Sequence, residues 1–185
     1  MITVRRSVAE LLLHYQPQGG TEGADVARVL EMVTTTDDPW SQQLPLHLTA
    51  SALVVHPATG RILLRWHTRQ QSWLQIGGHG DPGETEPLEI VLREGLEETG
   101  LGDLRPWPDA GLFHVVICAV PEKGDSPAHE HADLRFVLAT DSPDSARPER
   151  PDAPLCWLSL SRAAELTGQD NLRETIRRFG LIVAN

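Results

Sequence analysis

A glycine-rich loop that leads directly into a helix with clustered carboxylates is the strongest structural signal in this sequence. Residues 77–84 read Gly-Gly-His-Gly-Asp-Pro-Gly-Glu, and residues 93–101 read Arg-Glu-Gly-Leu-Glu-Glu-Thr-Gly-Leu. Glycines let a backbone adopt positive φ and approach a ligand closely. Thr85 as a cap, Pro87 in the first turn and Gly100 as a stop predict a helix between these two segments.

The glutamates of this helix share one face. At about 100° per residue, Glu94, Glu97 and Glu98 are spaced i, i+3 and i+4, so their side chains meet. Two carboxylates about 6 Å apart repel by roughly 3 kcal/mol at an effective dielectric of 20. A partly buried cluster therefore needs a cation, whereas an exposed one is a solvated face. The adjacent arc is predicted to be buried and comprises Leu88, Val91, Leu92, Gly95, Leu96 and Thr99.

The segment resembles the Nudix box of MutT-like hydrolases. In that box a glycine, five residues, a glutamate and seven residues precede Arg-Glu-apolar-any-Glu-Glu-any-Gly-apolar; Gly78 to Glu84 matches the front and Arg93 to Leu101 the back. Two departures are visible. Eight residues follow Glu84, an insertion of one residue that we place at 85–87, and Gly95 occupies the apolar position. The resemblance implies an α+β fold, an α/β/α Nudix sandwich with a mixed β-sheet flanked by helices.

The resemblance also implies a chemistry. Nudix enzymes cleave the pyrophosphate linkage of a nucleoside diphosphate linked to another moiety. Glu94, Glu97 and Glu98 would then hold Mg²⁺ or Mn²⁺, helped by a backbone carbonyl of Gly77 or Gly78. A metal there lowers the pKa of a bound water, and one glutamate, not identified by the sequence, would be the general base. Carboxylates combined with substrate phosphates are a common Mg²⁺ ligand set.

Candidate substrate contacts lie around the loop. Arg93 is expected to pair with Glu84 or Glu97 and fix the loop, with direct phosphate contact as the alternative. Arg65 and Arg69 precede the loop and are either phosphate contacts or exposed surface arginines. A tryptophan beside the loop can stack on a base or pack in the core. The predicted substrate-binding set is Arg65, Trp66, Arg69, Gly77, Gly78 and His79.

Histidines suggest a second site. His129, His131 and Asp133 alternate along one face of a predicted strand. His-x-His with a carboxylate two residues later is a transition-metal arrangement. We therefore expect a candidate second metal or phosphate site at His79, His129, His131 and Asp133, with ordinary hydrogen-bonded histidines as the alternative.

The composition of the chain argues against several classes of binding partner. The net charge of −10 argues against binding a nucleic-acid polymer, which requires a basic surface. Cys118 and Cys156 lie in apolar runs and are expected to be buried thiols in a reducing compartment. We find no apolar run of transmembrane length and no signal-peptide core. The expectation is a cytoplasmic protein without membrane contact, acting on a small nucleoside diphosphate derivative; a homodimer is left open.

The chain order predicts an N-terminal helical extension at residues 1–46 and a Nudix domain at 47–185. Two apolar stripes, 8–15 and 26–33, predict two helices that pack on the domain, a dimerisation or substrate-capping role being the alternative. A surface loop is expected at 142–154. Strands are expected at 48–56, 61–66, 73–76, 111–120, 129–138 and 155–158, and helices at 161–166 and 170–179.

Two other functions are compatible with the same fold. The first is an isopentenyl-diphosphate-isomerase-like enzyme, but the cysteine that such enzymes place after the tryptophan-bearing strand is absent from Gln75-Ile76-Gly77-Gly78-His79. The second is a catalytically inactive Nudix module that senses a nucleotide or binds a partner. Such modules typically lose box carboxylates, and this chain keeps Glu94, Glu97 and Glu98.

Overall fold

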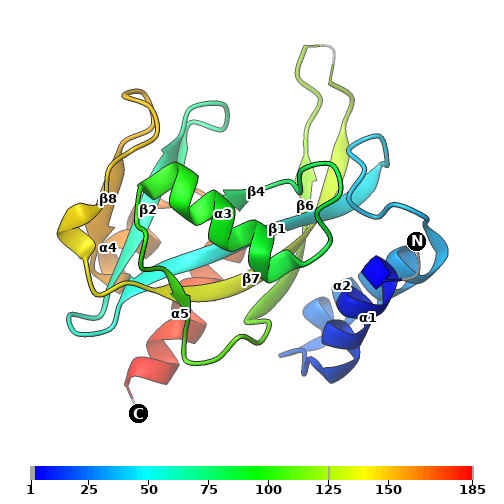
Figure 1. Ribbon diagram of the computed structural model, residues 1–185, viewed down its shortest axis with the longest axis horizontal. Helices are drawn as coiled ribbons and strands as arrows, with labels where there is room; N and C mark the ends of the chain where they lie inside the picture. Colours follow the sequence, from blue (N-terminus) through cyan, green and yellow to red (C-terminus); the bar gives the residue numbers. More distant parts are fainter. Residues whose placement is uncertain (1–2, 125, 185) are drawn as a thin grey trace.

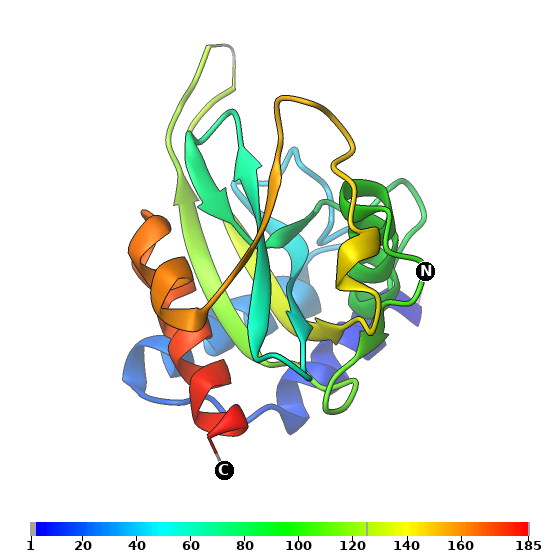
Figure 2. The same ribbon diagram turned by 90° about the vertical axis from the view of Figure 1, so that its left-hand side faces the viewer.

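The computed structural model describes residues 3–124 and 126–184, which form a central mixed β-sheet with helices on both sides (Figures 1 and 2). The strands are β1 Leu46–His56, β2 Arg61–His67, β3 Ser72–Leu74, β4 Ile76–Gly78, β5 Arg105–Pro106, β6 His114–Val120, β7 His129–Ala139 and β8 Leu155–Leu158. The helices are α1 Thr3–His14, α2 Gly20–Thr35, α3 Pro87–Thr99, α4 Leu160–Leu166 and α5 Asp170–Val183, with a 3-10 turn at Pro143–Ser145. The predicted mixed sheet flanked by helices is confirmed.

Strand β1 is the centre of the sheet. It pairs antiparallel with β2 and β4 and parallel with β7, and its burial is unbroken from His47 to Val55. A strand covered on both faces has no need of polar alternation, which explains its run of small and apolar residues. Strands β1 and β2, both predicted, form a hairpin with its turn between His56 and Arg61.

The two faces of the sheet bury separate apolar clusters. Because successive side chains of a strand point to opposite faces, Ala52 and Val54 of β1 join one cluster with residues of α1, α2 and α3. Leu53 and Val55 join the other with residues of α4 and α5. Figure 2 shows α3 on one side of the sheet and α4 and α5 on the other. None of the helices in the described ranges is both long and apolar enough to cross a lipid bilayer.

Helix α3 differs from the sequence prediction at its start and in part of its buried face. Its cap residue is Glu86 rather than Thr85, and no side chain caps it; Gly100 ends it with φ 67°, as predicted. Leu96, predicted to be buried, is 52% exposed, whereas Glu98 is only 8% exposed. Gly95 is buried as predicted, and Leu104 fills the space where a side chain would lie, 2.6 Å from a Cβ built at that position.

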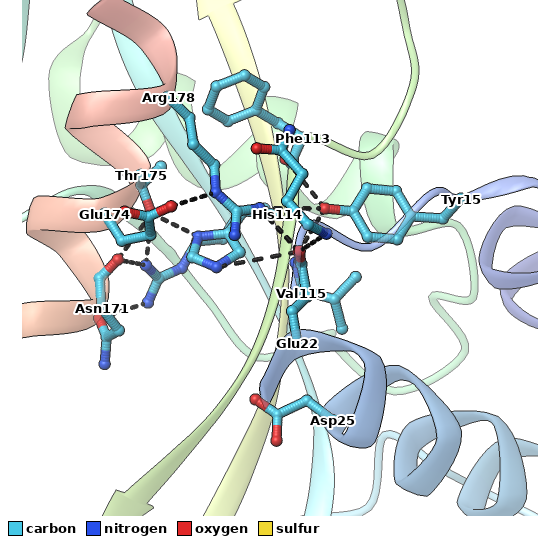
Figure 3. A network of polar contacts seen from close by, with 12 residues as sticks. Tyr15, Glu22, Asp25, Phe113, His114, Val115, Asn171, Glu174, Thr175 and Arg178 are labelled. Atoms are coloured by element: carbon cyan, nitrogen blue, oxygen red, sulfur yellow. Dashed lines mark hydrogen bonds and ion pairs between the residues drawn. The ribbon is translucent and has the colours of Figure 1, made fainter. Parts of the chain in front are cut away.

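A buried ionic network joins the N-terminal helices to the rest of the fold (Figure 3). Glu22 of α2 accepts hydrogen bonds from Nη1 of Arg178 in α5 at 2.9 and 3.0 Å. The same carboxylate also accepts from the Tyr15 hydroxyl and from the backbone N–H of Val115 in β6. The side chains of Glu22 and Arg178 are each 4% exposed. The extension is therefore fixed to the sheet by a charge pair as well as by apolar packing.

Candidate active site

Helix α3 places the glutamates of the predicted site against strand β4. The backbone N–H of Gly77 donates to Oε2 of Glu98 at 3.1 Å. A Cβ built on Gly78 would lie 2.8 Å from Oε1 of Glu94, so the backbone and this carboxylate are packed together with no room for a side chain. Gly77 has φ 135°, and its own Cβ would lie 2.4 Å from the Ala50 carbonyl. The glycines are thus required by the close approach of β4, β1 and α3.

Two of the three glutamates are largely buried. The side chains of Glu94 and Glu98 are 16% and 11% exposed, whereas that of Glu97 is 53% exposed. Burial raises the pKa of Glu98 to about 7, although Arg65 Nη1 lies 3.0 Å from its Oε1 and opposes this shift. Burial likewise raises the pKa of Glu94. Neighbouring groups compensate the negative charges of these two carboxylates only in part, and a bound divalent cation would compensate the rest.

Arg93 holds the loop to the helix. Its Nε and Nη2 donate to the two carboxylate oxygens of Glu84, each at 2.9 Å. Its Nη1 donates to Glu94 and Glu97 at 3.0 Å each, and its Nη2 also reaches the His79 carbonyl at 3.1 Å. The extra residue after Glu84 therefore does not prevent the pair. Because its guanidinium N–H groups already have these partners, Arg93 fixes the loop and has few donors available for a phosphate.

The carboxylates keep oxygens free for a ligand despite these arginines. Within the described residues, Oε2 of Glu94 and Oε1 of Glu97 accept no hydrogen bond. Oε1 of Glu98 forms an ion pair with Arg65 and Oε2 accepts one hydrogen bond from Gly77, whereas a carboxylate oxygen can accept twice. The group therefore presents unshared oxygen lone pairs from one helix face, which fits a hard divalent cation.

The main cavity, with a volume of about 470 Å³, lies beside these glutamates and not over them. Gly77 and Gly78 line the cavity and also contact Glu98 and Glu94, so β4 separates the two. His79 also lines it. Other polar residues that line the cavity come from β1, β6 and β7, from the segment before β4 and from the start of α5. They include Thr49, Ser51, Gln75, Cys118, Asp133, Arg135 and Asn171.

Three of the predicted substrate contacts do not line this cavity, although one of them, Arg69, lines a smaller pocket that adjoins it at Gln70 and Val120. Arg65 is 7% exposed and paired with Glu98, Trp66 packs edge-on against Trp73 at 5.7 Å, and the Arg69 carbonyl accepts from Lys123. None of the three lines the main cavity as described. Arg65 and Trp66 lie on β2, whose side chains at these positions pack against neighbouring elements.

Around Asp133, the cavity contains Ser51, Gln75 and Arg135, polar residues that the sequence did not single out. Asp133 accepts from Ser51 at 2.8 Å and from Nε of Arg135 at 2.8 Å, and Arg135 is 1% exposed. Gln75 donates to the same carboxylate at 3.3 Å, while its Oε1 is buried without a hydrogen-bond partner in the described structure. The available signal was Ser51, a polar residue in a strand whose other residues from Ala50 to Val55 are apolar.

The thiol that lines the cavity is not activated. Burial raises the pKa of Cys118 to about 11, and its sulfur accepts from Arg135 and Asn171. Cys118 and Cys156 are both free, as expected, and both are half-buried rather than fully buried. A protonated thiol is a weak nucleophile, so this cysteine has no evident covalent role.

The histidines converge, with one member that the sequence analysis missed. His79, His131 and His47 bring ring nitrogens within 4.8 Å of one another, and the His129 ring lies 5.0 Å from that of His131. His47 is 1% exposed. Asp133, the fourth predicted member, is instead held by Ser51 and Arg135 and is absent from the group. His47 could have been found only from the register of β1 against β7.

The comparisons with known proteins agree with this geometry. The family model described as NUDIX domain matches residues 45–179. Among solved structures, a Caenorhabditis elegans Ap4A hydrolase complex has a TM-score of 0.60 and 19% identity, covering 74% of this chain and 97% of its own. An Escherichia coli dihydroneopterin triphosphate pyrophosphohydrolase has a TM-score of 0.59 and 18% identity, covering 75% and 97%.

A NUDIX family hydrolase from Clostridium perfringens has a TM-score of 0.57 and 21% identity, covering 74% of this chain and 97% of its own. No curated protein sequence matches the chain. At these identities the structures establish the fold, and the family model, which spans most of the chain, establishes the family. The resemblance read from residues 78–101 is confirmed, and the chain belongs to the NUDIX domain family.

Proposed function

We propose that the chain is a divalent-metal-dependent pyrophosphohydrolase that cleaves the diphosphate linkage of a nucleoside diphosphate linked to another moiety. Membership of the NUDIX family supports a hydrolase acting on pyrophosphate bonds. The observation that carries the proposal is the pairing of two largely buried carboxylates, Glu94 and Glu98, with the glycine backbone of β4. This arrangement is costly for two anions alone and suits a cation that also binds phosphate.

The residues would act as follows. Glu94, Glu97 and Glu98 would hold Mg²⁺ or Mn²⁺, which supplies charge neutralisation at phosphorus and an acidified water. Arg93 keeps the loop and the helix in register through Glu84 and the His79 carbonyl. A glutamate oxygen not needed by the ion would accept the proton of the attacking water.

The substrate would reach beyond the diphosphate into the main cavity. That cavity adjoins the glutamates through Gly77 and Gly78 and presents hydrogen-bonding groups rather than a basic surface. Oδ1 of Asp133, which accepts only from Thr49 among the described residues, can accept a second hydrogen bond from an N–H or O–H donor of a base or sugar. One neighbouring structure is titled an Ap4A hydrolase and another a dihydroneopterin triphosphate pyrophosphohydrolase, so nucleotide-like substrates are the first choice.

A substrate panel tests the proposal. Nucleotide sugars, dinucleotides and nucleoside triphosphates are incubated with Mg²⁺ or Mn²⁺, and diphosphate cleavage is followed by chromatography. The variants Glu97→Gln and Glu98→Gln should lose metal-dependent turnover by at least about 100-fold while remaining folded. Glu89→Gln, an exposed glutamate on the same helix, is the matched control and should keep full turnover. Wild-type rates in both site variants would refute these ligand assignments.

The alternatives predict other results from the same panel. An isomerase-like enzyme would leave every diphosphate of the panel intact and would instead rearrange isopentenyl diphosphate when this compound is added. A sensor module would bind a nucleotide without turnover under any metal. Either outcome would displace hydrolysis as the function.

A further inference from the structure

Four histidines meet at one end of the sheet because of strand register. His47 of β1 is the direct partner of His131 in the parallel β1–β7 pair. His129 precedes His131 by two residues and so shares its face. Gly78 is opposite Ala50 in the β1–β4 pair, and the next residue, His79, follows β4 toward His47. Three segments of the chain therefore deliver imidazoles to one place.

The nitrogen spacing matches a metal site. Nε2 of His47 lies 3.1 Å from Nε2 of His79, and the ligand nitrogens of His47, His79 and His131 all lie within 4.8 Å of one another. Nitrogens bound tetrahedrally at about 2.05 Å from Zn²⁺ are about 3.3 Å apart. The His47–His79 distance already fits, and the two distances to His131, each within 4.8 Å, would have to contract by at most about 1.5 Å to place one ion among the three rings.

The outer nitrogen of His47 is also arranged as it is in metal sites. Nδ1 of His47 lies 3.0 Å from the Leu44 carbonyl, so Nδ1 carries the proton and Nε2 presents a lone pair to the other rings. Metal-bound histidines almost always donate their second ring N–H to a carbonyl or carboxylate in this way. Hydrogen bonds join Nε2 of His47 to Nε2 of His79 at 3.1 Å and Nε2 of His129 to Nε2 of His131 at 3.2 Å. These two pairs do not account for the contact between them, since the His131 ring lies 5.0 Å from that of His47 and 4.9 Å from that of His79.

The ligand set selects the class of ion. Asp133, the nearest carboxylate on β7, is engaged by Ser51 and Arg135, so the group offers nitrogen donors only. Imidazole suits Zn²⁺, Co²⁺, Ni²⁺ and Cu²⁺, whereas Mg²⁺ prefers oxygen. His79 and His131 line the main cavity, so an ion held by three rings would keep a coordination position open to it.

We propose that His47, His79 and His131 bind one zinc-class transition-metal ion through Nε2, with a fourth position open to the main cavity for water or a phosphate oxygen. This site is separate from the magnesium or manganese site of the glutamates and does not depend on the hydrolytic activity. Its nearest link to that site is His79, whose backbone carbonyl accepts from Arg93.

Cobalt binding tests the site directly. Protein without a polyhistidine tag is stripped with chelator, saturated with Mg²⁺ to occupy the carboxylates, and titrated with Co²⁺ while the visible d–d absorption is recorded. Wild type should bind one Co²⁺ per chain with a four- or five-coordinate spectrum, and Zn²⁺ should displace it. The variants His79→Asn and His131→Asn should weaken Co²⁺ binding by more than about 100-fold.

Three controls make the result decisive. His56→Asn removes a histidine outside the group, bonded to Thr59, and should bind Co²⁺ like wild type. Glu97→Gln should also keep the Co²⁺ spectrum, which separates this site from the proposed hydrolytic one. Circular dichroism checks that the His79→Asn and His131→Asn variants are folded. Absence of stoichiometric Co²⁺ or Zn²⁺ in wild type, or unchanged binding in folded His79→Asn and His131→Asn proteins, would overturn the proposal.

Discussion

Replacement of Glu22 by glutamine should destabilise the protein far more than loss of an exposed ion pair. Glu22→Gln leaves Arg178 buried, with only Glu174 at 2.9 Å to compensate its charge. Removing one partner of a buried pair costs about 3–5 kcal/mol. Because Glu174 remains, we take the lower end, about 3 kcal/mol, which corresponds to a decrease in Tm of about 8 °C for a chain of this length.

Thermal and urea unfolding followed by circular dichroism measure this loss. The control is Arg28→Ala, which removes a pair with Glu130 that is 51% and 37% exposed and should cost no more than about 1 kcal/mol. The double variant Glu22→Gln with Arg178→Met removes the uncompensated charge and should be more stable than Glu22→Gln alone. A Glu22→Gln loss no larger than that of Arg28→Ala would refute the assignment of this pair as a buried anchor.

Three further predictions address the loop, the arginine and pH. Gly77→Ala forces a Cβ to 2.4 Å from the Ala50 carbonyl at φ 135°, so urea unfolding should show a loss of about 3 kcal/mol, whereas Gly83→Ala, with open space around it, should lose about 1 kcal/mol. Arg93→Lys cannot reproduce the planar fork and should lower kcat/KM for hydrolysis by about 100-fold with an unchanged circular dichroism spectrum; wild-type kinetics would contradict the role of the fork. Burial lowers the pKa of His114 from 6.5 to about 4, so the unfolded chain binds a proton at a higher pH than the folded chain does. The free energy of unfolding is therefore at its full value above pH 6.5 and decreases by up to about 3 kcal/mol as the pH falls toward 4. Urea midpoints of wild type and His114→Gln across this range should differ in slope, and parallel curves would show that this histidine is not the cause.

Local sequence signals predicted the elements of the fold well. The turn between the first two strands, the proline at the start of α3 and the glycine at its end all have mechanisms that act within a few residues. The buried face of α3 was predicted only in part, since Gly95 and Thr99 are buried as expected but Leu96 is exposed and Glu98 is buried. Helical periodicity does not distinguish a carboxylate paired with an arginine of another strand, Arg65, from a solvated one.

The candidate sites divide in the same way. The glutamates and Arg93 are close in sequence, so their contacts follow from helix spacing. His47 lies more than eighty residues before His131, and only the parallel pairing of β1 with β7 places them side by side. Arg178 and Glu22 are still farther apart in the sequence, and no local sequence pattern at either residue predicts their contact.

The position of His79 has a thermodynamic consequence. Its ring belongs to the histidine group, while its backbone carbonyl is held by the same arginine that binds Glu94 and Glu97. If an ion on the imidazoles displaces this residue, the arrangement of the carboxylates changes with it. Linkage then requires that filling the glutamate site alters the affinity of the histidines by an equal factor. The binding of one ion would then change the affinity for the other through a single loop residue, although the two ions share no ligand.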